Sequence, residues 1–196
     1  MPMTITPYNL VQGPADLYVG AFGTAEPTDA NATVVAGSPG AGWTGVGGTE
    51  IGVTVEIDVT YVDLKVNQLL DPVGARPTDR LITVKTQLSE ATYQNMQTAL
   101  NQLNTVTVSG AYTTIDPITT TSATQPTYAA LIVDGWAPTL STGLPARRRW
   151  IIRKVISKPK VMEDYELAKK VLYDITFQAY YVSSGVPLFH RIDQTA

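Results

Sequence analysis

The sequence has 196 residues, a net charge of −3, no cysteine and one histidine, His190. A chain of this length forms one domain and buries about 70% of its unfolded surface, so it needs no disulfide or metal to hold a core. The lack of cysteine excludes thiol catalysis, thiolate metal sites and disulfides. The first ten residues lack the pattern of a secretory signal, and no apolar run approaches the roughly 20 residues that span a bilayer, so we expect no membrane insertion.

The charge is distributed unevenly along the chain. Residues 1–146 hold four basic and twelve acidic residues, a balance of −8. Residues 147–160, RRRWIIRKVISKPK, hold seven basic residues and no acid, and residues 161–196 hold three basic and five acidic residues. A chain with this polarity can pair head to tail with itself, or its basic stretch can meet an anion.

A sequence period of two dominates, which is typical of half-buried β-strands. In residues 50–61, EIGVTVEIDVTY, Ile51, Val53 and the following odd-numbered residues to Tyr61 share one face, and polar residues occupy the other. Other segments rich in β-branched and aromatic residues, bounded by turn residues, also predict strands. In chain order, the predicted strands cover 15–22, 51–66, 80–88, 105–112, 127–136, 148–155 and 170–182.

One helix is predicted, over about residues 89–103. Ser89 is placed to cap it, and Glu90 in its first turn suits the helix dipole. Met96, Leu100 and Leu103 follow at spacings of four and three and form one apolar stripe. We therefore predict a mainly β fold, a mostly antiparallel sandwich or barrel with one packed α-helix.

The predicted connections are long for a compact domain, and loops of this length are usually functional or disordered. We interpret the chain as one domain, 1–196, whose irregular segments contact neighbouring molecules. These segments are an N-terminal arm (1–14), an extended loop with little core of its own (23–50), a long hairpin (62–84) and a threonine-rich loop (113–127).

The sequence offers little for catalysis. His190, Asp193 and Ser183 or Ser184 are the residue types of a nucleophilic triad, but no G-x-S-x-G elbow is present. The glycine-rich run at 42–52 precedes a predicted strand, whereas a phosphate-binding loop follows one. We expect no enzymatic activity, no cofactor and no metal site.

Carboxylates and arginines gather on two predicted strands. Glu56 and Asp58, with Glu50 further along, lie on the polar face of the first long strand, where they form either a solvated face or a negative wall toward a partner. In the basic run, Arg147, Arg149 and Arg153 are expected to share one strand face. Three interpretations stay open for that face: self-association, nucleic-acid binding or simple solvation.

The stretch NQLLDPVGARPTDR (67–80) separates two predicted strands. Asp71-Pro72 and Pro77-Thr78 favour turns, and Gly74 tolerates a positive φ. The tip carries Asp71, Arg76, Asp79 and Arg80, none of which is a natural nucleophile or base at neutral pH. We interpret the tip as solvated or as a contact surface.

An ordered set of short motifs resembles a known family. The set comprises LYVG (17–20), GWTGVGG around residues 43–47, the N-Q…D-P-V-G…P-T run (67–78) and LSEAT (88–92). In this order they resemble the major tail tube proteins of bacteriophages with long, non-contractile tails. The resemblance covers about residues 13–101, and the basic run 147–160 has no counterpart in it.

The resemblance implies a structural virion protein of the phage tail, assembled in the host cytoplasm. Such proteins form hexameric rings whose inner strands join around a lumen, and the rings stack into a tube that delivers DNA. The implied partners are other copies of the chain, a tape measure protein, and tail tip and terminator proteins; DNA passes without specific binding. On this basis we assign Glu50, Glu56 and Asp58 to the lumen, and the hairpin 62–84 with the arm 23–50 to ring–ring contact.

Two other classes stay open. A tail terminator or head–tail connector would form a single ring that does not polymerise. A β-sandwich carbohydrate-binding module would line an exposed groove with aromatic residues, whereas most tyrosines here fall on apolar strand faces, as Tyr61, Tyr173 and Tyr181 do.

Overall fold

The computed structural model describes residues 9–28, 39–118, 125–138, 146–158 and 161–194. Within these ranges the chain forms ten strands and one short helix. The elements are β1 (Asp16–Ala21), β2 (Trp43–Gly45), β3 (Thr49–Leu64), β4 (Gly74–Leu88), α1 (Tyr93–Ala99), β5 (Asn104–Ser109), β6 (Tyr112–Pro117), β7 (Ala129–Ala137), β8 (Ala146–Ser157), β9 (Tyr173–Ala179) and β10 (Phe189–Asp193).

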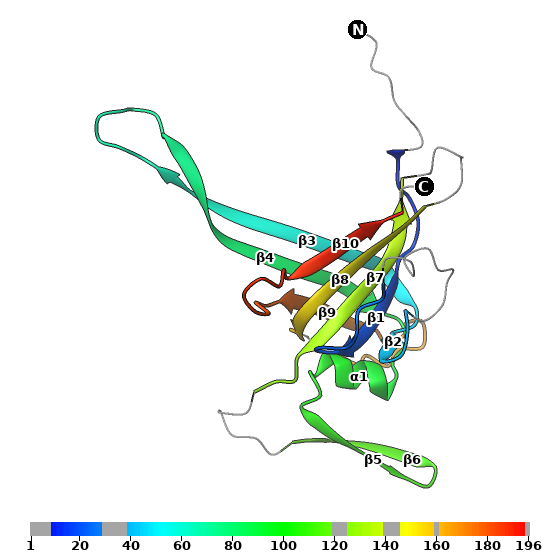
Figure 1. The fold of residues 1–196 in the computed structure, drawn as a ribbon. Coiled ribbons are helices and arrows are strands. Elements are labelled where there is room, and N and C mark those ends of the chain that lie inside the picture. Colours follow the sequence, from blue (N-terminus) through cyan, green and yellow to red (C-terminus); the bar gives the residue numbers. More distant parts are fainter. Residues whose placement is uncertain (1–8, 29–38, 119–124, 139–145, 159–160, 195–196) are drawn as a thin grey trace.

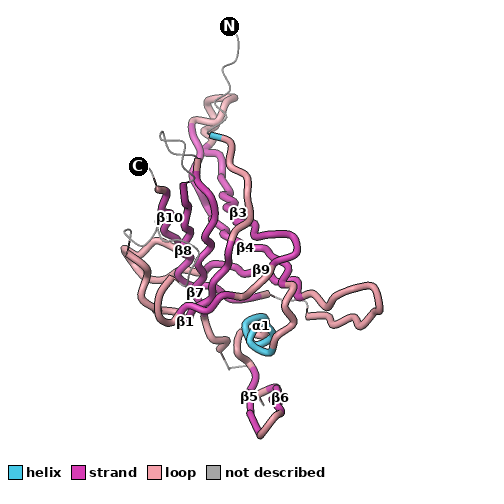
Figure 2. The backbone as a smooth tube through the Cα atoms, turned by 90° about the vertical axis from the view of Figure 1, so that its right-hand side faces the viewer, coloured by secondary structure: helices cyan, strands magenta, loops and turns pink. Residues whose placement is uncertain are grey.

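Eight of the described strands form one antiparallel sheet, in the order β2-β1-β7-β8-β9-β4-β3, with β10 also paired to β8. The remaining two, β5 and β6, form a separate hairpin that projects from the body beside α1 (Figures 1 and 2). The prediction of a mainly antiparallel β fold with one helix is confirmed.

The sheet divides at β8. Residues Arg148–Ile152 of this strand pair with β10, and Val155–Ser157 pair with β9, while β7 occupies the opposite edge. The part made of β9, β4 and β3 therefore crosses behind the part made of β7, β8 and β10 (Figure 1). One apolar cluster joins both parts, with Leu131 and Ile152 from one and Val84 and Phe177 from the other.

The centre of the sheet is buried on both faces. Leu131 and Ile152 face the main cluster, whereas their neighbours Ile132 and Ile151 pack under Trp43 of β2 in a second cluster. A strand covered on both sides needs an apolar run without alternation, which is what AALIV in β7 provides. Each such side chain contributes about 1.5–3 kcal/mol by burial.

The helix is shorter than the sequence pattern indicates. It begins after Thr92, whose hydroxyl accepts a hydrogen bond from the Asn95 amide at 3.2 Å, so the prediction that Ser89 caps it was wrong. Glu90 precedes the helix and accepts from the Gly48 N–H at 2.9 Å. At the other end Leu100 is the C-cap, and Leu103 is 36% exposed instead of packing in the predicted stripe.

The alternation in β3 breaks at one residue. Gly52 has φ 76° and the register with β4 shifts between Thr49 and Val53, which marks a β-bulge. Val53 packs against the core, but Ile51 is 69% exposed and does not share that side as predicted. A glycine supplies the positive φ that the bulge requires.

Two predicted segments have a different structure. The predicted strand 105–112 is a hairpin, because Gly110, with φ 60°, turns the chain between β5 and β6. In the predicted loop 23–50, β2 pairs with β1, and Trp43 and Val46 are buried in the core. Parts of the predicted arm 1–14, loop 23–50 and loop 113–127 lie outside the described residues, at 1–8, 29–38 and 119–124.

Several of the short sequence motifs meet in space. Gly20 of LYVG pairs with Trp43, so β1 and β2 bring two motifs together. Glu90 of LSEAT binds Gly48, and the side-chain amide of Asn95 donates to the Val46 carbonyl at 2.9 Å. These residues hold the β2–β3 connection against the start of α1, which is a structural role.

Candidate interaction surfaces

The β3–β4 hairpin extends well beyond the sheet. The two strands pair from Thr49↔Leu88 to Leu64↔Gly74, but β9 covers β4 only from Thr83 to Leu88. The distal hairpin, defined here as residues 57–82, therefore has no strand beside either edge among the described residues. Ile82 still packs in the core, and Gly74–Leu81 extends from it by roughly 27 Å at about 3.4 Å per residue. Figure 1 shows this arm at its left. Open strand edges are templates for pairing with another chain.

Apolar side chains lie exposed along the distal hairpin. Leu70 at the turn is completely exposed, and Tyr61 and Leu69 are 61% and 58% exposed. An isolated two-stranded hairpin is marginally stable in water, and exposed apolar patches mark interaction sites. The other large exposed apolar residues of this segment are Ile57, Val62, Leu64, Val66, Val73 and Leu81.

The charged residues predicted for ring–ring contact all lie on this hairpin and are exposed. Asp79 and Arg80 line one shallow hollow together with Tyr61, whereas Asp71 lies in the turn. Asp79 accepts a hydrogen bond from the backbone N–H of Arg80 at 2.8 Å. Asp71, Arg76 and Arg80 form no ion pair with any residue that the structure describes. Their charges are thus available to a second molecule.

The predicted carboxylate wall on β3 is partly neutralised. Glu56 pairs with Lys85 at 2.5 Å, and Glu50 pairs with Lys170. The hydrogen bond from Lys85 lowers the pKa of Glu56. Asp58 is exposed on the same strand. The face therefore carries less net negative charge than the three acids alone indicate.

This polar face continues onto the neighbouring strands. The register places Glu56 beside Thr83, and Thr83 beside Gln178 of β9. Gln87 donates a hydrogen bond to Asp174 at 2.6 Å. The opposite side of the same strands faces the core. A sheet with one buried and one polar side is suited to line a water-filled space.

The arginines of β8 are occupied within the chain. Arg149 is 3% exposed and binds Asp134 of β7 through two hydrogen bonds of 2.6 Å. Arg153 binds Glu26 at 2.5 and 2.9 Å, and the guanidinium of Arg147 lies 4.0 Å from the centre of the Trp136 ring. The expectation of a basic face presented by all three arginines is wrong, because Arg149 is buried against Asp134 and Arg153 is paired with Glu26.

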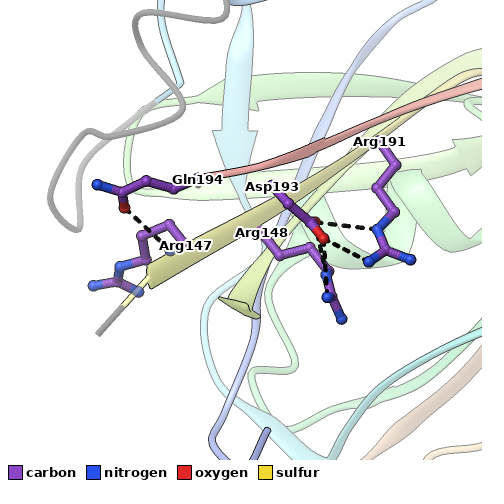
Figure 3. A network of polar contacts seen from close by, with 5 residues as sticks. All are labelled: Arg147, Arg148, Arg191, Asp193 and Gln194. Carbon is purple, nitrogen blue, oxygen red and sulfur yellow. Dashed lines mark hydrogen bonds and ion pairs between the residues drawn. The ribbon is translucent and has the colours of Figure 1, made fainter. Parts of the chain in front are cut away.

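A second ion-pair network joins β8 to β10 (Figure 3). Asp193 accepts two hydrogen bonds from Arg148, at 2.8 and 3.0 Å, and two from Arg191, at 3.1 and 2.6 Å. These bonds from Arg191 and Arg148 hold the pKa of Asp193 well below its usual range. Gln194 accepts from the Arg147 amide at 3.3 Å and extends the network.

Two of the residues considered for catalysis, His190 and Asp193, have other neighbours. The His190 Nδ1 atom lies 4.0 Å from Glu26, and Asp193 is held by the two arginines. In the described ranges no three His, Asp or Glu side chains gather to hold a metal ion. Those ranges also contain no helix that is long and apolar enough to cross a membrane.

The sequence patterns did not predict one feature, an apolar cavity at the surface. A cavity of about 340 Å³ opens between the end of β1, β2, β8 and the segment 182–186, and Trp43, Ala130 and Ile151 form its apolar floor. Residues distant in sequence build it, so no local motif reveals it.

The chain matches no known protein-family model, and a comparison with curated proteins gave no match.

Proposed function

We propose that this protein is a structural subunit that assembles with copies of itself into stacked rings, as the tube of a phage tail. The observation that carries the proposal is the distal hairpin, with its open strand edges, exposed leucines and unpaired charges. Such a surface is costly to leave in water and is explained by contact with another molecule. The motif order of residues 13–101 selects the tail tube among self-assembling proteins.

The contact is heterologous in this proposal. A projecting arm on one side of a subunit meets a different surface on the next, and contacts of this type close into rings or continue as open filaments. Rings that stack through such arms grow into a tube. Neighbouring subunits can also extend the sheet across a ring through the open edges of β3 and β4.

The polar face of β3, β4 and β9 lines the lumen in this proposal. Threonine and glutamine side chains lie on this face. Its negative charges, from Glu56, Asp58 and Asp174, outnumber the positive charge of Lys85. Phosphates find few cations to bind on such a wall. DNA therefore passes without the many phosphate–cation contacts that make ordinary binding tight.

The implied partners follow from the same resemblance. They are a tape measure protein inside the growing tube and tip and terminator proteins at its ends. Assembly takes place in the host cytoplasm, and the virion tail is the final location.

In this proposal Arg149 and Arg153 of β8 do not contact other copies directly, because acids of the same chain already bind them.

Negative-stain electron microscopy of concentrated pure protein, with light scattering alongside, tests this function. We expect stacked rings or hollow tubes. Stable single rings would instead favour a terminator or connector. Monomers at all concentrations, with no growth on added tail-tip complex, would contradict the proposal, and sugar binding would then be tested.

A further inference from the structure

The cavity between β1, β2 and β8, called the β1–β8 cavity below, has no occupant in the function proposed so far. Its floor is apolar and buried, with Trp43 at 6%, Ala130 at 3% and Ile151 at 1% exposure. Its rim is accessible, since Phe22 and Val186 are 45% and 39% exposed. The charged pair at its edge, Glu26 and Arg153, is mutually neutralised. The opening therefore favours an apolar side chain.

The same chain presents a matching apolar group. Leu69 and Leu70 lie at the turn of the distal hairpin, outside any cluster of the core. The hairpin is paired through Leu64↔Gly74, just below the turn, and its tip lies far from β1 and β2 (Figure 1). A paired hairpin cannot fold back over that distance, so these leucines do not reach their own cavity. They can reach the cavity of another copy.

Charge complementarity supports this pairing. Asp71 directly follows the two leucines and has no ion-pair partner among the described residues. Beside the cavity, the ammonium of Lys154 lies 4.2 Å from the centre of the Tyr128 ring and 5.5 Å from that of Phe22. No acidic side chain within the described ranges pairs with Lys154. An acid beside an apolar tip and a lysine beside an apolar cavity are complementary.

We infer that the hairpin turn of one copy docks into the β1–β8 cavity of another, with Leu70 entering the cavity and Asp71 approaching Lys154. This inference rests on the proposed self-assembly and names the two surfaces that meet. The two surfaces differ, so the contact is heterologous. Each copy inserts its own hairpin turn into a second copy and accepts the turn of a third in its cavity.

Cysteine cross-linking tests the contact directly, because the natural chain has no cysteine. Single variants Leu70→Cys and Val186→Cys, one carrying a mass tag, are mixed and oxidised with copper–phenanthroline. We expect a cross-link between the two different chains. The control mixes Val186→Cys with Tyr112→Cys, which lies at the turn of the other exposed hairpin and is 78% exposed. A yield no higher than this control would overturn the contact, whether or not rings form.

Charge exchange gives an independent measurement. Asp71→Lys and Lys154→Asp should each raise the protein concentration needed for assembly about tenfold, which corresponds to about 1.4 kcal/mol. The double variant should recover most of that loss. Two damaged single variants without recovery in the double variant would overturn the pairing of these residues. Failure of the wild-type protein to form rings or tubes, even with added tail-tip complex, would instead overturn the proposed function, so the two failures are distinguishable.

Discussion

Strand β8 and the distal hairpin are both rich in charge, but they satisfy it in opposite ways. In β8, Arg149 and Arg153 find acids of the same chain, and Arg149 is almost completely buried. In the hairpin, Asp71 and Arg76 have no ion-pair partner among the described residues, and the Leu70 side chain is completely exposed. Arginines of the most conspicuous run of charge in the sequence thus support the fold, whereas the charges of the hairpin tip stay exposed and unpaired among the described residues.

The difference comes from sheet register. Arg149 meets Asp134 because β7 pairs with β8, and Arg148 meets Asp193 because β10 pairs with the same strand. From Gly74 to Ile82, on the tip side of Thr83, β4 pairs with β3 and with no other strand of the described residues. A charge cluster alone therefore does not indicate a binding surface, since the strands beside it decide whether its charge is already used.

The largest effect is expected on removing the distal hairpin. Asp58 and Leu81 are register partners, so replacing residues 59–80 with Asn-Gly joins them through a two-residue turn. Core residues such as Val84 and Phe177 lie outside the deletion. We expect a monomer that unfolds cooperatively, with the assembly concentration raised at least about 100-fold, a loss of roughly 3 kcal/mol per contact. Sedimentation velocity measures this, and assembly at the wild-type concentration would show that another surface drives it.

Breaking the buried pair of β8 should affect folding instead. Asp134→Asn leaves the charge of Arg149 without its carboxylate, at an expected loss of about 3–5 kcal/mol in the free energy of unfolding. The double variant Arg149→Met with Asp134→Leu should recover most of this, because apolar groups of similar size replace a buried pair at little cost. Urea denaturation gives both values. A loss below about 1 kcal/mol, as for surface pairs, would contradict an internal role for β8.

The network at β10 predicts a pH dependence. Since the pKa of Asp193 is lowered in the folded chain, its ionised form stabilises the fold above the unfolded-state pKa of about 3.9, and this contribution is lost as pH falls through the lower folded value. We expect Asp193→Asn to lose about 2 kcal/mol at pH 7. The difference from wild type should shrink below pH ~3.9. Thermal unfolding across this range measures it, and a constant difference would contradict the assignment.

The smallest effect is expected for a single hairpin charge. Arg76→Glu should raise the assembly concentration up to about fivefold, because an exposed ion pair contributes about 0.2–1 kcal/mol. Light scattering at low and high salt measures it, and the difference should fade at high salt. Lys169→Glu, which makes the same charge change outside the hairpin, serves as control. Equal effects of both variants would point to net charge alone.

Much of the fold could be predicted because its strands follow simple periods. The alternation in β3 and β9 and the apolar run in β7 are local signals. Local signals failed where a glycine redirected the backbone, as at Gly52 and Gly110, and where burial depended on a distant partner, as for Trp43. The helix begins after Thr92 and not near Ser89 as predicted, because Glu90 binds Gly48, 42 residues away in the sequence.

The candidate surfaces were predictable only in part. The turn residues and mixed charges of 67–80 marked the hairpin tip, but the exposure of Leu69 and Leu70 depends on how far β4 runs past β9. The role of Arg149 depends on its register with Asp134, and the β1–β8 cavity is built by five separate segments. Sequence spacing gives none of these relations.

Hydrogen exchange measured by mass spectrometry, on assembled and unassembled wild-type protein, tests the central claim most directly. Backbone amides at the open edges of the distal hairpin should exchange readily in the free subunit, and the proposed contacts would cover them on assembly. We predict a large gain of protection in peptides from residues 57–82. Peptides from β8 should change little even where its side chains meet another copy, because its backbone is already paired with β7, β9 and β10. Protection gained in β8, with the hairpin unchanged, would contradict the account.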